Sequence, residues 1–189
     1  MKVRESDMPD QAYWESLIDH CGLLEEMSLH DCVSVFEFGV GYGSILQCFH
    51  GGDTAIAGID IDEIMVQATR KRLDRLDMAS SIHHGDFFDA ALLDTLGKFS
   101  VCLLMNILHH TDPRALISRA SRMLTPDGRI GICHWRDDID TPRGPPMAVR
   151  IGLDRAERLV SSEGLALLAS GNSVSSPYHY YLVARMTVA

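Results

Sequence analysis

The sequence predicts an α/β fold with a doubly wound, mostly parallel sheet, and the main evidence is the first apolar run and the turn after it. Val33 to Phe38 has the length and the β-branched and aromatic content of a buried strand. Three glycines at alternate positions follow it, namely Gly39, Gly41 and Gly43. Glycine adopts positive φ and carries no side chain, so the backbone can turn sharply and lie against a ligand. We therefore expect a cofactor at this turn.

Two classes of cofactor use such a turn, and the glycine spacing separates them. A dinucleotide fold has Gly-x-Gly-x-x-Gly, but counting from Gly39 the third glycine position holds Ser44. Residues from Ser44 onwards are expected to form a helix whose N-terminus points free N–H groups at the ligand. The string Glu37-x-Gly39-x-Gly41-x-Gly43 instead resembles the first motif of class I S-adenosylmethionine (SAM)-dependent methyltransferases. The resemblance implies SAM as the cofactor, with Glu37 and the three glycines at its site.

A second apolar strand, Ala55 to Asp62, ends in carboxylates. In a doubly wound sheet the ends of neighbouring strands meet at one crevice, where ligands bind. An ionised carboxylate there can accept both hydroxyl hydrogen bonds of a ribose. Asp60 is therefore the predicted ribose ligand, and Ile61 is placed to pack against the adenine. The alternative is a helix N-cap, because Asp60 and Asp62 both precede a helical run from Glu63.

A third strand-like segment, Ser81 to His84, leads into Asp86 and Phe87. This passage resembles the third motif of the same family. The resemblance implies that Asp86 binds the adenine amino group and that Phe87 shields the ring. An ordinary turn followed by core phenylalanines is the alternative reading of this segment alone.

The fourth strand, Phe99 to Met105, is followed by a segment that the family places beside the transferable methyl group. The resemblance implies that Asn106 contacts the methionine portion of SAM, Leu108 the adenine, and His109 or His110 the substrate. Imidazole can act as a general base near neutral pH, so both histidines are catalytic candidates, and a structural role is equally open for either. Adjacent side chains diverge and no further ligands accompany this pair, so we expect no metal site.

A fifth strand follows the turn Pro126-Asp127-Gly128, after a helix that ends near Leu124. This leucine, proline, glycine and apolar-strand passage is also common in the family. The match to the family runs through residues 33 to 134 with all elements in order, and it specifies the cofactor better than the substrate.

Residues 135–150 are predicted to form the active-site loop. They combine charges, prolines and an aromatic residue, and they leave the carboxyl edge of a strand, where ligands bind in an open α/β sheet. Prolines stiffen the loop, and Arg136 and Arg143 are suited to grip a carboxylate or phosphate. His134 and Arg143 are therefore further catalytic candidates. The alternative is a solvated connection in which Arg136 pairs with the acidic residues that follow it.

Residues 1–30 are predicted to form an N-terminal helical cap, because Pro9 and Asp10 suit a helix start and apolar residues recur at helical spacing after them. In the family such a helix commonly covers the SAM pocket. Tyr13 and Trp14 are therefore candidates for the outer wall of the pocket, with core packing as the alternative.

The C-terminal part supplies a helix at about residues 153–162 and two strands, near residues 165–170 and 179–186. They agree with the antiparallel hairpin that closes the seven-stranded sheet of this family. Residues 1–189 are expected to form a single domain, which is large enough for a complete sheet with helices on both faces.

Composition limits the partners and the location. The net charge of −9 argues against a nucleic-acid partner, and the Asx-Pro-Pro-aromatic sequence of base-modifying methyltransferases is missing. Neither a signal peptide nor a membrane-spanning run is found, so we expect a cytoplasmic location and no membrane partner. The five cysteines have no paired or metal-type spacing, so we expect reduced thiols.

These patterns together predict a SAM-dependent methyltransferase that acts on a small-molecule acceptor. A sulfonium methyl is already activated by its charge, so proximity and alignment can supply much of the catalysis. This agrees with a clear cofactor site that lacks a clear catalytic dyad. Two alternatives stay open, a methyltransferase of protein side chains and a SAM-binding module without catalysis, and a dehydrogenase is a third and weaker one.

Overall fold

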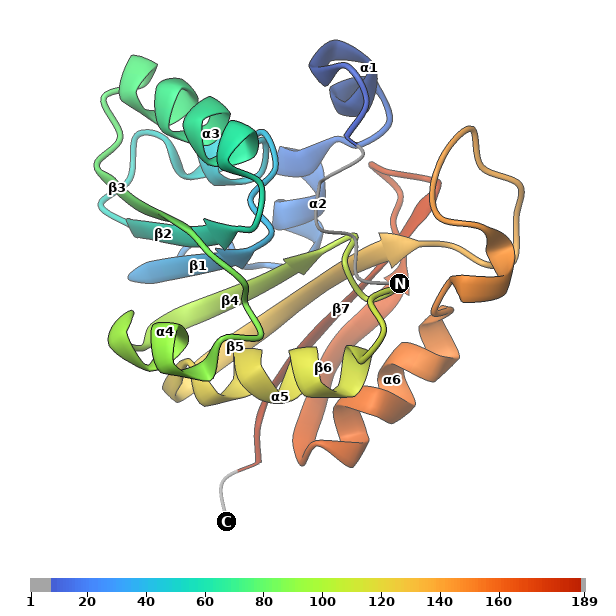
Figure 1. Ribbon diagram of the computed structural model, residues 1–189. Coiled ribbons are helices and arrows are strands. Elements are labelled where there is room, and N and C mark those ends of the chain that lie inside the picture. Colours follow the sequence, from blue (N-terminus) through green and yellow to red (C-terminus); the bar gives the residue numbers. More distant parts are fainter. Residues whose placement is uncertain (1–7, 188–189) are drawn as a thin grey trace.

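The computed structural model describes residues 8–187, which fold around one seven-stranded sheet (Figure 1). The strands are β1 (Ser34–Phe38), β2 (Ala55–Asp60), β3 (Ser80–His84), β4 (Phe99–Met105), β5 (Leu124–Trp135), β6 (Leu165–Asn172) and β7 (His179–Met186). Their order in the sheet is β3-β2-β1-β4-β5-β7-β6. β7 runs antiparallel to β5 and β6, and the remaining pairs of described strands are parallel. The predicted fold class, a doubly wound sheet with a C-terminal antiparallel hairpin, is confirmed.

Helices cover both faces of this sheet (Figure 1). They are α1 (Gln11–Ser16), α2 (His20–Glu26), α3 (Glu63–Arg75), α4 (Ala90–Thr95), α5 (Pro113–Arg122) and α6 (Leu153–Ser162), with the 3-10 helices η1 (Leu46–Phe49) and η2 (Met147–Val149). Successive residues of β1 divide between two cores, since Phe36 and Phe38 pack with α4, α5 and α6 while Val35 packs with α2, η1 and α3. None of the helices within residues 8–187 is long and apolar enough to span a membrane.

The order of the strands positions the site. β1 and β4 lie side by side, and the chain continues from β1 to β2 on one side and from β4 to β5 on the other. Ligands in open α/β sheets bind at the carboxyl ends of the strands where the order reverses in this way. The segments that follow β1 and β4 therefore meet at the expected ligand edge.

The helix predicted from Ser44 is wrong. After the glycine turn the chain forms further turns and then only the four-residue 3-10 helix η1. Gly51 and Gly52 follow almost at once, and glycine is among the poorest helix formers, so the segment ends there. Ligand contacts at this turn must therefore come from the turn backbone and from side chains, because the described chain has no helix N-terminus there.

The expectation of reduced cysteines is wrong for two of the five. Cys21 in α2 and Cys48 in η1 form a disulfide, with Cα atoms 5.4 Å apart and a sequence separation of 27. Their spacing does not indicate pairing, because only the packing of α2 against η1 brings them together. Cys102 and Cys133 are free and buried in β4 and β5, and burial raises the pKa of both thiols.

The turn predicted at residues 126–128 is an irregularity within β5. Phe99 pairs with Leu124, but Val101 pairs with Arg129, so the residues of β5 between these pairs bulge out of the ladder with β4. The other predicted strands and the helix α6 begin and end within two residues of the predicted positions.

Breaking the Cys21–Cys48 disulfide is expected to lower the free energy of unfolding by about 3 kcal/mol, because the bond closes a loop in the unfolded chain and lowers its conformational entropy. Urea unfolding with and without dithiothreitol measures the difference. The double variant Cys21→Ser/Cys48→Ser should be equally unstable in both conditions. Cys32→Ser, which removes a free thiol, should keep the wild-type response. A wild-type stability that does not respond to reductant would contradict the disulfide.

Candidate active site

The glycine turn after β1 is left-handed at three positions. φ is +74° at Gly39, +51° at Gly41 and +69° at Gly43, a region that other residues rarely adopt. At Gly43 a Cβ would lie 2.8 Å from Thr69 Cγ2, whereas at Gly41 the nearest described atom is Met8 Cε at 3.4 Å. The turn is therefore packed at Gly43 and presents accessible backbone at Gly41.

Two side chains hold Gly41 by its N–H and its C=O. Asp60 Oδ2 accepts a hydrogen bond from the Gly41 N–H at 2.9 Å, and Thr69 Oγ1 donates one to the Gly41 C=O at 2.8 Å. Asp60 Oδ1 accepts the N–H of Asp62 at 2.9 Å, while Ile61 between them is half-buried. Asp60 is buried, and burial raises the pKa of its carboxyl. Each carboxylate oxygen has more than one lone pair, so Asp60 can hold the turn and still accept hydrogen bonds from a ligand.

Two buried polar side chains at the carboxyl ends of β1 and β4 lack a hydrogen-bond partner among the described residues. They are Glu37 in β1, through Oε2, and Asn106 after β4, through both atoms of its amide. Glu37 is 3% exposed and Asn106 is 8% exposed. Burial, and then the charge of Asp60, raises the pKa of Glu37 well above its usual value. Buried polar groups are costly when unpaired, so these two indicate a ligand that completes their hydrogen bonds.

An aromatic group lies on the β3 side of the site. Asp86 Oδ1 accepts the N–H of Phe88 at 2.8 Å, and the Phe87 ring centroid lies 5.7 Å from that of His110. His110 lies closer still to Phe88, with ring centroids 4.6 Å apart. The structure thus brings His110 to the residues predicted for the adenine. Leu108 is fully buried in the core on the α5 side, and its contact with adenine stays a prediction.

His109 lies instead against His134. His109 Nδ1 is 3.1 Å from His134 Nε2, although the two residues come from different segments of the carboxyl edge. His134 is fully buried in β5, and burial is the main cause that lowers its pKa to about 3. His109 is half-buried, and burial lowers its pKa also. The structure therefore brings two of the four predicted catalytic residues into contact.

A buried arginine organises the loop after β5. Arg150 is 8% exposed, and its guanidinium donates to the C=O of Pro145 at 2.9 Å, to the C=O of Arg136 at 2.6 Å and to Thr141 Oγ1 at 2.7 Å. The same guanidinium lies 6.0 Å from the centre of the Trp135 ring. The loop is thus folded around a side chain at its end, in addition to being stiffened by prolines.

The two other arginines of this loop differ in their surroundings. Arg136 makes two hydrogen bonds to Asp138, at 2.9 and 2.8 Å, so the ion pair considered from the sequence forms. The C=O of Arg143 accepts from Thr141 Oγ1 at 2.6 Å and from Arg150 Nη2 at 3.4 Å. These bonds fix the backbone from which the Arg143 side chain projects.

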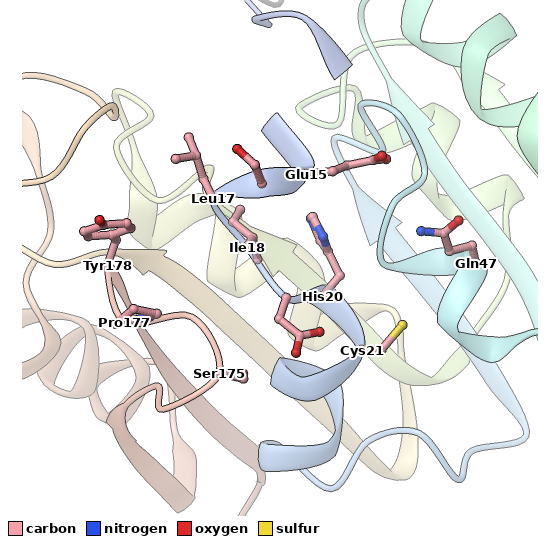
Figure 2. A pocket seen from close by; sticks show the side chains of 11 residues that line it. Glu15, Leu17, Ile18, His20, Cys21, Gln47, Ser175, Pro177 and Tyr178 are labelled. Atoms are coloured by element: carbon pink, nitrogen blue, oxygen red, sulfur yellow. The ribbon is translucent and has the colours of Figure 1, made fainter. Parts of the chain in front are cut away.

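The N-terminal cap borders a cavity of about 500 Å³ (Figure 2). Its walls come from the segment that joins α1 to α2, from Gln47 and from the residues before β7, including Pro177 and Tyr178. His20 lines it too, and burial is the main cause that lowers the pKa of His20 to about 4. The lining includes none of the residues predicted for the cofactor, but Glu15 and Gln47 of the lining are hydrogen-bonded to Ser44 of the turn.

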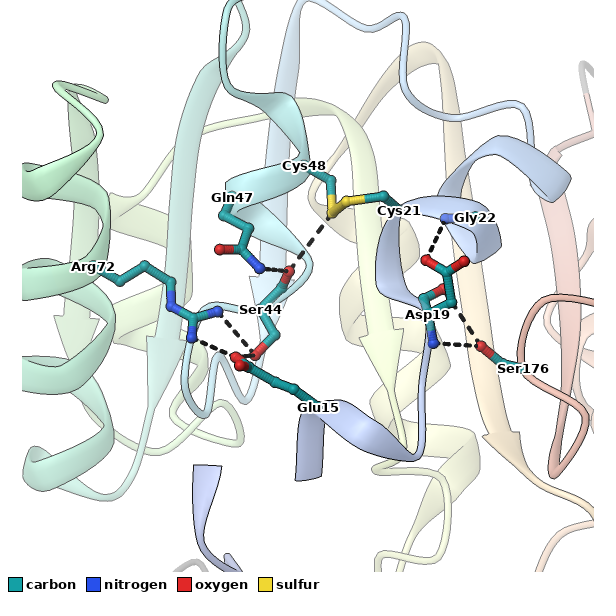
Figure 3. The surroundings of a disulfide bond; sticks show 9 residues. All are labelled: Glu15, Asp19, Cys21, Gly22, Ser44, Gln47, Cys48, Arg72 and Ser176. Atoms are coloured by element: carbon teal, nitrogen blue, oxygen red, sulfur yellow. Dashed lines mark hydrogen bonds and ion pairs between the residues drawn. A yellow bond between two sulfur atoms is a disulfide. The ribbon is translucent and has the colours of Figure 1, made fainter. Parts of the chain in front are cut away.

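The cap is fastened to the glycine turn by a polar network (Figure 3). Glu15 in α1 forms an ion pair with Arg72 of α3 and accepts a hydrogen bond from Ser44 Oγ at 2.8 Å. Arg72 Nη1 also donates to Ser44 Oγ at 3.1 Å. Tyr42 OH donates to the C=O of Pro9 at 2.8 Å. Because Tyr42 and Ser44 belong to the turn, the positions of cap and turn are coupled.

The aromatic residues of the cap reach the end of β5. The rings of Trp14 and Trp135 meet edge to face with centroids 6.2 Å apart, while Tyr13 is 43% exposed. His179 packs against Trp135 with ring centroids 4.1 Å apart. The part of the chain described here holds no group of three or more His, Cys, Asp or Glu side chains arranged for a metal ion.

A family model described as "Methyltransferase domain" matches residues 36–132 of this chain. The chain belongs to this methyltransferase family. The matched region contains the glycine turn, Asp60, Asp86, Asn106 and His109, which are the residues gathered at the carboxyl edge. Family membership therefore favours an enzyme over the binding module and the dehydrogenase considered from the sequence. A search of curated proteins finds no match to the methyltransferase.

Solved structures share the fold of this methyltransferase. A SAM-dependent methyltransferase from Aquifex aeolicus has a TM-score of 0.79 at 17% identity, over 94% of this chain and 95% of that one. Magnesium protoporphyrin IX methyltransferase (ChlM) from Synechocystis PCC 6803, solved with bound SAH, has a TM-score of 0.69 at 14% identity, over 93% and 84%. The [4+2]-cyclase SpnF has a TM-score of 0.72 at 14% identity, over 88% and 79%. At such identities the likeness shows the fold alone.

S-adenosylmethionine is the cofactor of the methyltransferase, and the residues present fit it. The unpaired Glu37 carboxyl and the unpaired Asn106 amide offer hydrogen bonds to the amino-acid portion of such a molecule. Asp60 keeps lone pairs for hydroxyl groups, and Phe87 offers a ring face for a base. Gly41, whose backbone is accessible, stands between Glu37 and Asp60 in the sequence.

Sequence reasoning missed the residues that hold the parts of the site together. Thr69, Arg72 and Glu15 lie within helices, where no motif sets them apart from solvent-facing neighbours. One local feature of the sequence indicates that Arg150 is buried. It stands next to the apolar Ile151, where the core resumes after a polar loop.

Gly41→Val is expected to abolish SAM binding and to leave the fold intact, because a branched side chain at φ +51° strains the turn and enters ligand space. Calorimetry with SAM measures the first effect and circular dichroism the second. Gly97→Val is the matched control, since Gly97 has φ +91° with no atom near its Cβ position and lies at the amino end of β4. It should bind SAM normally. Normal binding by Gly41→Val would place the cofactor away from this turn.

Proposed function

We propose that this methyltransferase transfers the methyl group of SAM to a small-molecule acceptor. The observation that carries the proposal is the folding of the loop at residues 136–150 around Arg150 and onto Trp135. The cap, fastened through Glu15, flanks the same edge of the sheet. A mouth flanked on two sides suits a small acceptor, whereas a methyltransferase of protein side chains needs a flat and open one.

The proposal assigns the two ends of SAM to different strands. Glu37 and Asn106 bind the methionine portion, and the backbone of the turn at Gly39, Gly41 and Gly43 lies against the cofactor. The unpaired atoms of the first two support this assignment. A cationic amino group beside Glu37 would stabilise the ionised form of a carboxyl whose pKa burial raises.

The proposal assigns the adenosine portion of SAM to the ends of β2 and β3. Asp60 accepts the ribose hydroxyl hydrogen bonds and Ile61 packs against the adenine. Asp86 binds the adenine amino group while Phe87 shields the ring. The buried position of Asp60 and the cluster of rings around Phe87 support these roles.

Catalysis by this chain consists chiefly of alignment. SAM, when bound, supplies a methyl group on a positively charged sulfur. The glycine turn and Asn106 orient that group, the cap and the loop limit the access of water, and His109 is placed to receive a proton from the acceptor. Holding two reactants in line can contribute an effective molarity of about 10⁵ M or more.

A cytoplasmic location is also part of the proposal. The Cys21–Cys48 disulfide tests it, because glutathione and thioredoxin keep thiols reduced in the cytosol. An oxidising compartment would preserve the disulfide instead.

A transfer assay with methyl-tritiated SAM tests the proposed acceptor class. Label is expected in small molecules when the enzyme is incubated with a metabolite library, and none is expected in acid-precipitated protein from a protein extract. Gly41→Val serves as the inactive background. Label in the precipitated protein alone would contradict the proposal and favour a protein side-chain acceptor.

Arg143 is the proposed grip for an anionic group of the acceptor, since it belongs to the loop after β5 and its backbone is fixed by Thr141 and Arg150. Arg143→Ala should lower kcat/KM for the acceptor about tenfold, the loss of one charged hydrogen bond, and should keep SAM affinity within about twofold.

Steady-state kinetics and calorimetry measure these two quantities. Arg136→Ala is the matched control and should change neither, because it removes an arginine that is engaged on the surface. Unchanged kinetics in Arg143→Ala would place this side chain in solvent, and lost SAM binding would make it part of the cofactor site.

A further inference from the structure

Two hydrogen bonds in series connect the backbone at the end of β5 to His109. His134 Nδ1 lies 3.3 Å from the C=O of Trp135, and His134 Nε2 lies 3.1 Å from His109 Nδ1. A carbonyl oxygen can only accept, so His134 carries its proton on Nδ1. Nε2 of the neutral ring is then an acceptor, and His109 Nδ1 must be the donor. One backbone carbonyl therefore determines the proton position on both rings.

Both rings are neutral near pH 7. His134 is fully buried, and burial first, then the charge of His109, lowers its pKa to about 3. Burial first, then the charge of His110, lowers the pKa of His109. The titratable or charged groups around the pair are His110, His179, Arg150 and Tyr180. Arg150 and the cationic form of His110 oppose a proton on the pair, whereas burial lowers the pKa of His179 to about 3 and leaves it neutral near pH 7.

His109 keeps one nitrogen for other contacts. Its Nδ1 faces His134, so Nε2 lies on the far side of the ring. Nε2 makes no hydrogen bond to residues 8–187 and is not among their buried unpaired atoms. His109 is half-buried and follows Asn106 at the carboxyl edge of the sheet. Its unprotonated nitrogen is thus available at the edge where the methyl group is transferred.

We propose that His134 is a positioning residue that holds His109 in the Nδ1–H form, so that His109 Nε2 is the general base for an acceptor hydroxyl group. This inference rests on the proposed methyl transfer and names its substrate class. A hydroxyl acceptor needs such a base most, because an amine already has a free lone pair and a thiol ionises more easily. The geometry therefore favours O-methylation.

Methyl transfer in the site couples loss of the acceptor proton to cleavage of the carbon–sulfur bond. The acceptor hydroxyl gives its proton to His109 Nε2 while its oxygen forms a bond to the methyl carbon. The carbon–sulfur bond breaks and its electron pair stays on sulfur, which leaves neutral S-adenosylhomocysteine. His109, now cationic, donates from both nitrogens, and its Nδ1–H bond to His134 is kept. The proton then leaves to solvent from Nε2.

Nuclear magnetic resonance of the wild-type protein tests the tautomers without a variant that could misfold. Long-range ¹H–¹⁵N spectra of ¹⁵N-histidine protein at pH 7.5 should show both rings as Nδ1–H tautomers, although free histidine prefers Nε2–H. Spectra of His109→Asn and His134→Gln assign the two signals. An Nε2–H form of His109 would overturn the proposal.

Kinetics on the acceptor found by the transfer assay tests the consequence. His134→Gln can keep an oxygen acceptor for His109 Nδ1–H and should retain kcat within about threefold, whereas His134→Phe should lose about tenfold in kcat, the factor of one hydrogen bond. His134→Phe should also move the acidic limb of the pH profile to lower pH, because the cationic form of His109 loses an acceptor. SAM affinity should not change in either variant.

His179→Gln is the control for altering a buried histidine of the same region that is not bonded to His109, and its pH profile should match the wild type. An acidic limb that does not move in His134→Phe would assign His134 a structural role only. If label is transferred solely to amines or thiols and His109→Asn keeps full activity, the base assignment fails while the methyl-transfer proposal survives. If no small molecule accepts label, the proposed function fails. Nδ1–H forms of His109 and His134 in the resonance spectra would then still support the positioning of His109 by His134.

Discussion

The two hydrogen bonds that fix the backbone of Gly41 are the constraint on which the rest of the site depends. A glycine turn by itself is flexible, but here Asp60 accepts a hydrogen bond from the Gly41 N–H and Thr69 donates one to the Gly41 C=O. These bonds join the ends of β1 and β2 and the helix α3 into one unit. The cap is attached to the same turn through Ser44 and Tyr42. A shift of the turn would therefore move the ligand-facing backbone and the cap together.

Buried polar groups divide the carboxyl edge into two halves. At the ends of β1 and β4, Glu37 and Asn106 leave hydrogen-bonding atoms unpaired. On the side of β5, His109 and His134 pair with each other, and the backbone completes the series. Unpaired groups in a core are unfavourable and persist where a ligand completes them. The first half suits the binding of a charged donor, and the second suits the removal of a proton from an acceptor.

Much of the fold could be predicted from the sequence because its signals are local. The run from Phe99 to Met105 and the helical segment Leu153–Ser162 have the predicted bounds, since apolar runs and helical periodicity are read within one element. The helix predicted after Ser44 failed because two glycines end the segment within a few residues. The disulfide of Cys21 was missed because its partner lies in another element and no spacing rule connects them.

The sequence by itself determined the class of sheet, the edge at which a ligand is expected and the residues at the ends of its strands. Each of these depends on one strand and on the turn that directly follows it, and both are continuous in the chain. Only the tertiary structure decided that His109 meets His134, that His110 turns to Phe88 and that Arg150 closes its loop. These contacts join separate elements, and their distances follow from the packing of helices on the sheet, which spacing along the chain does not encode.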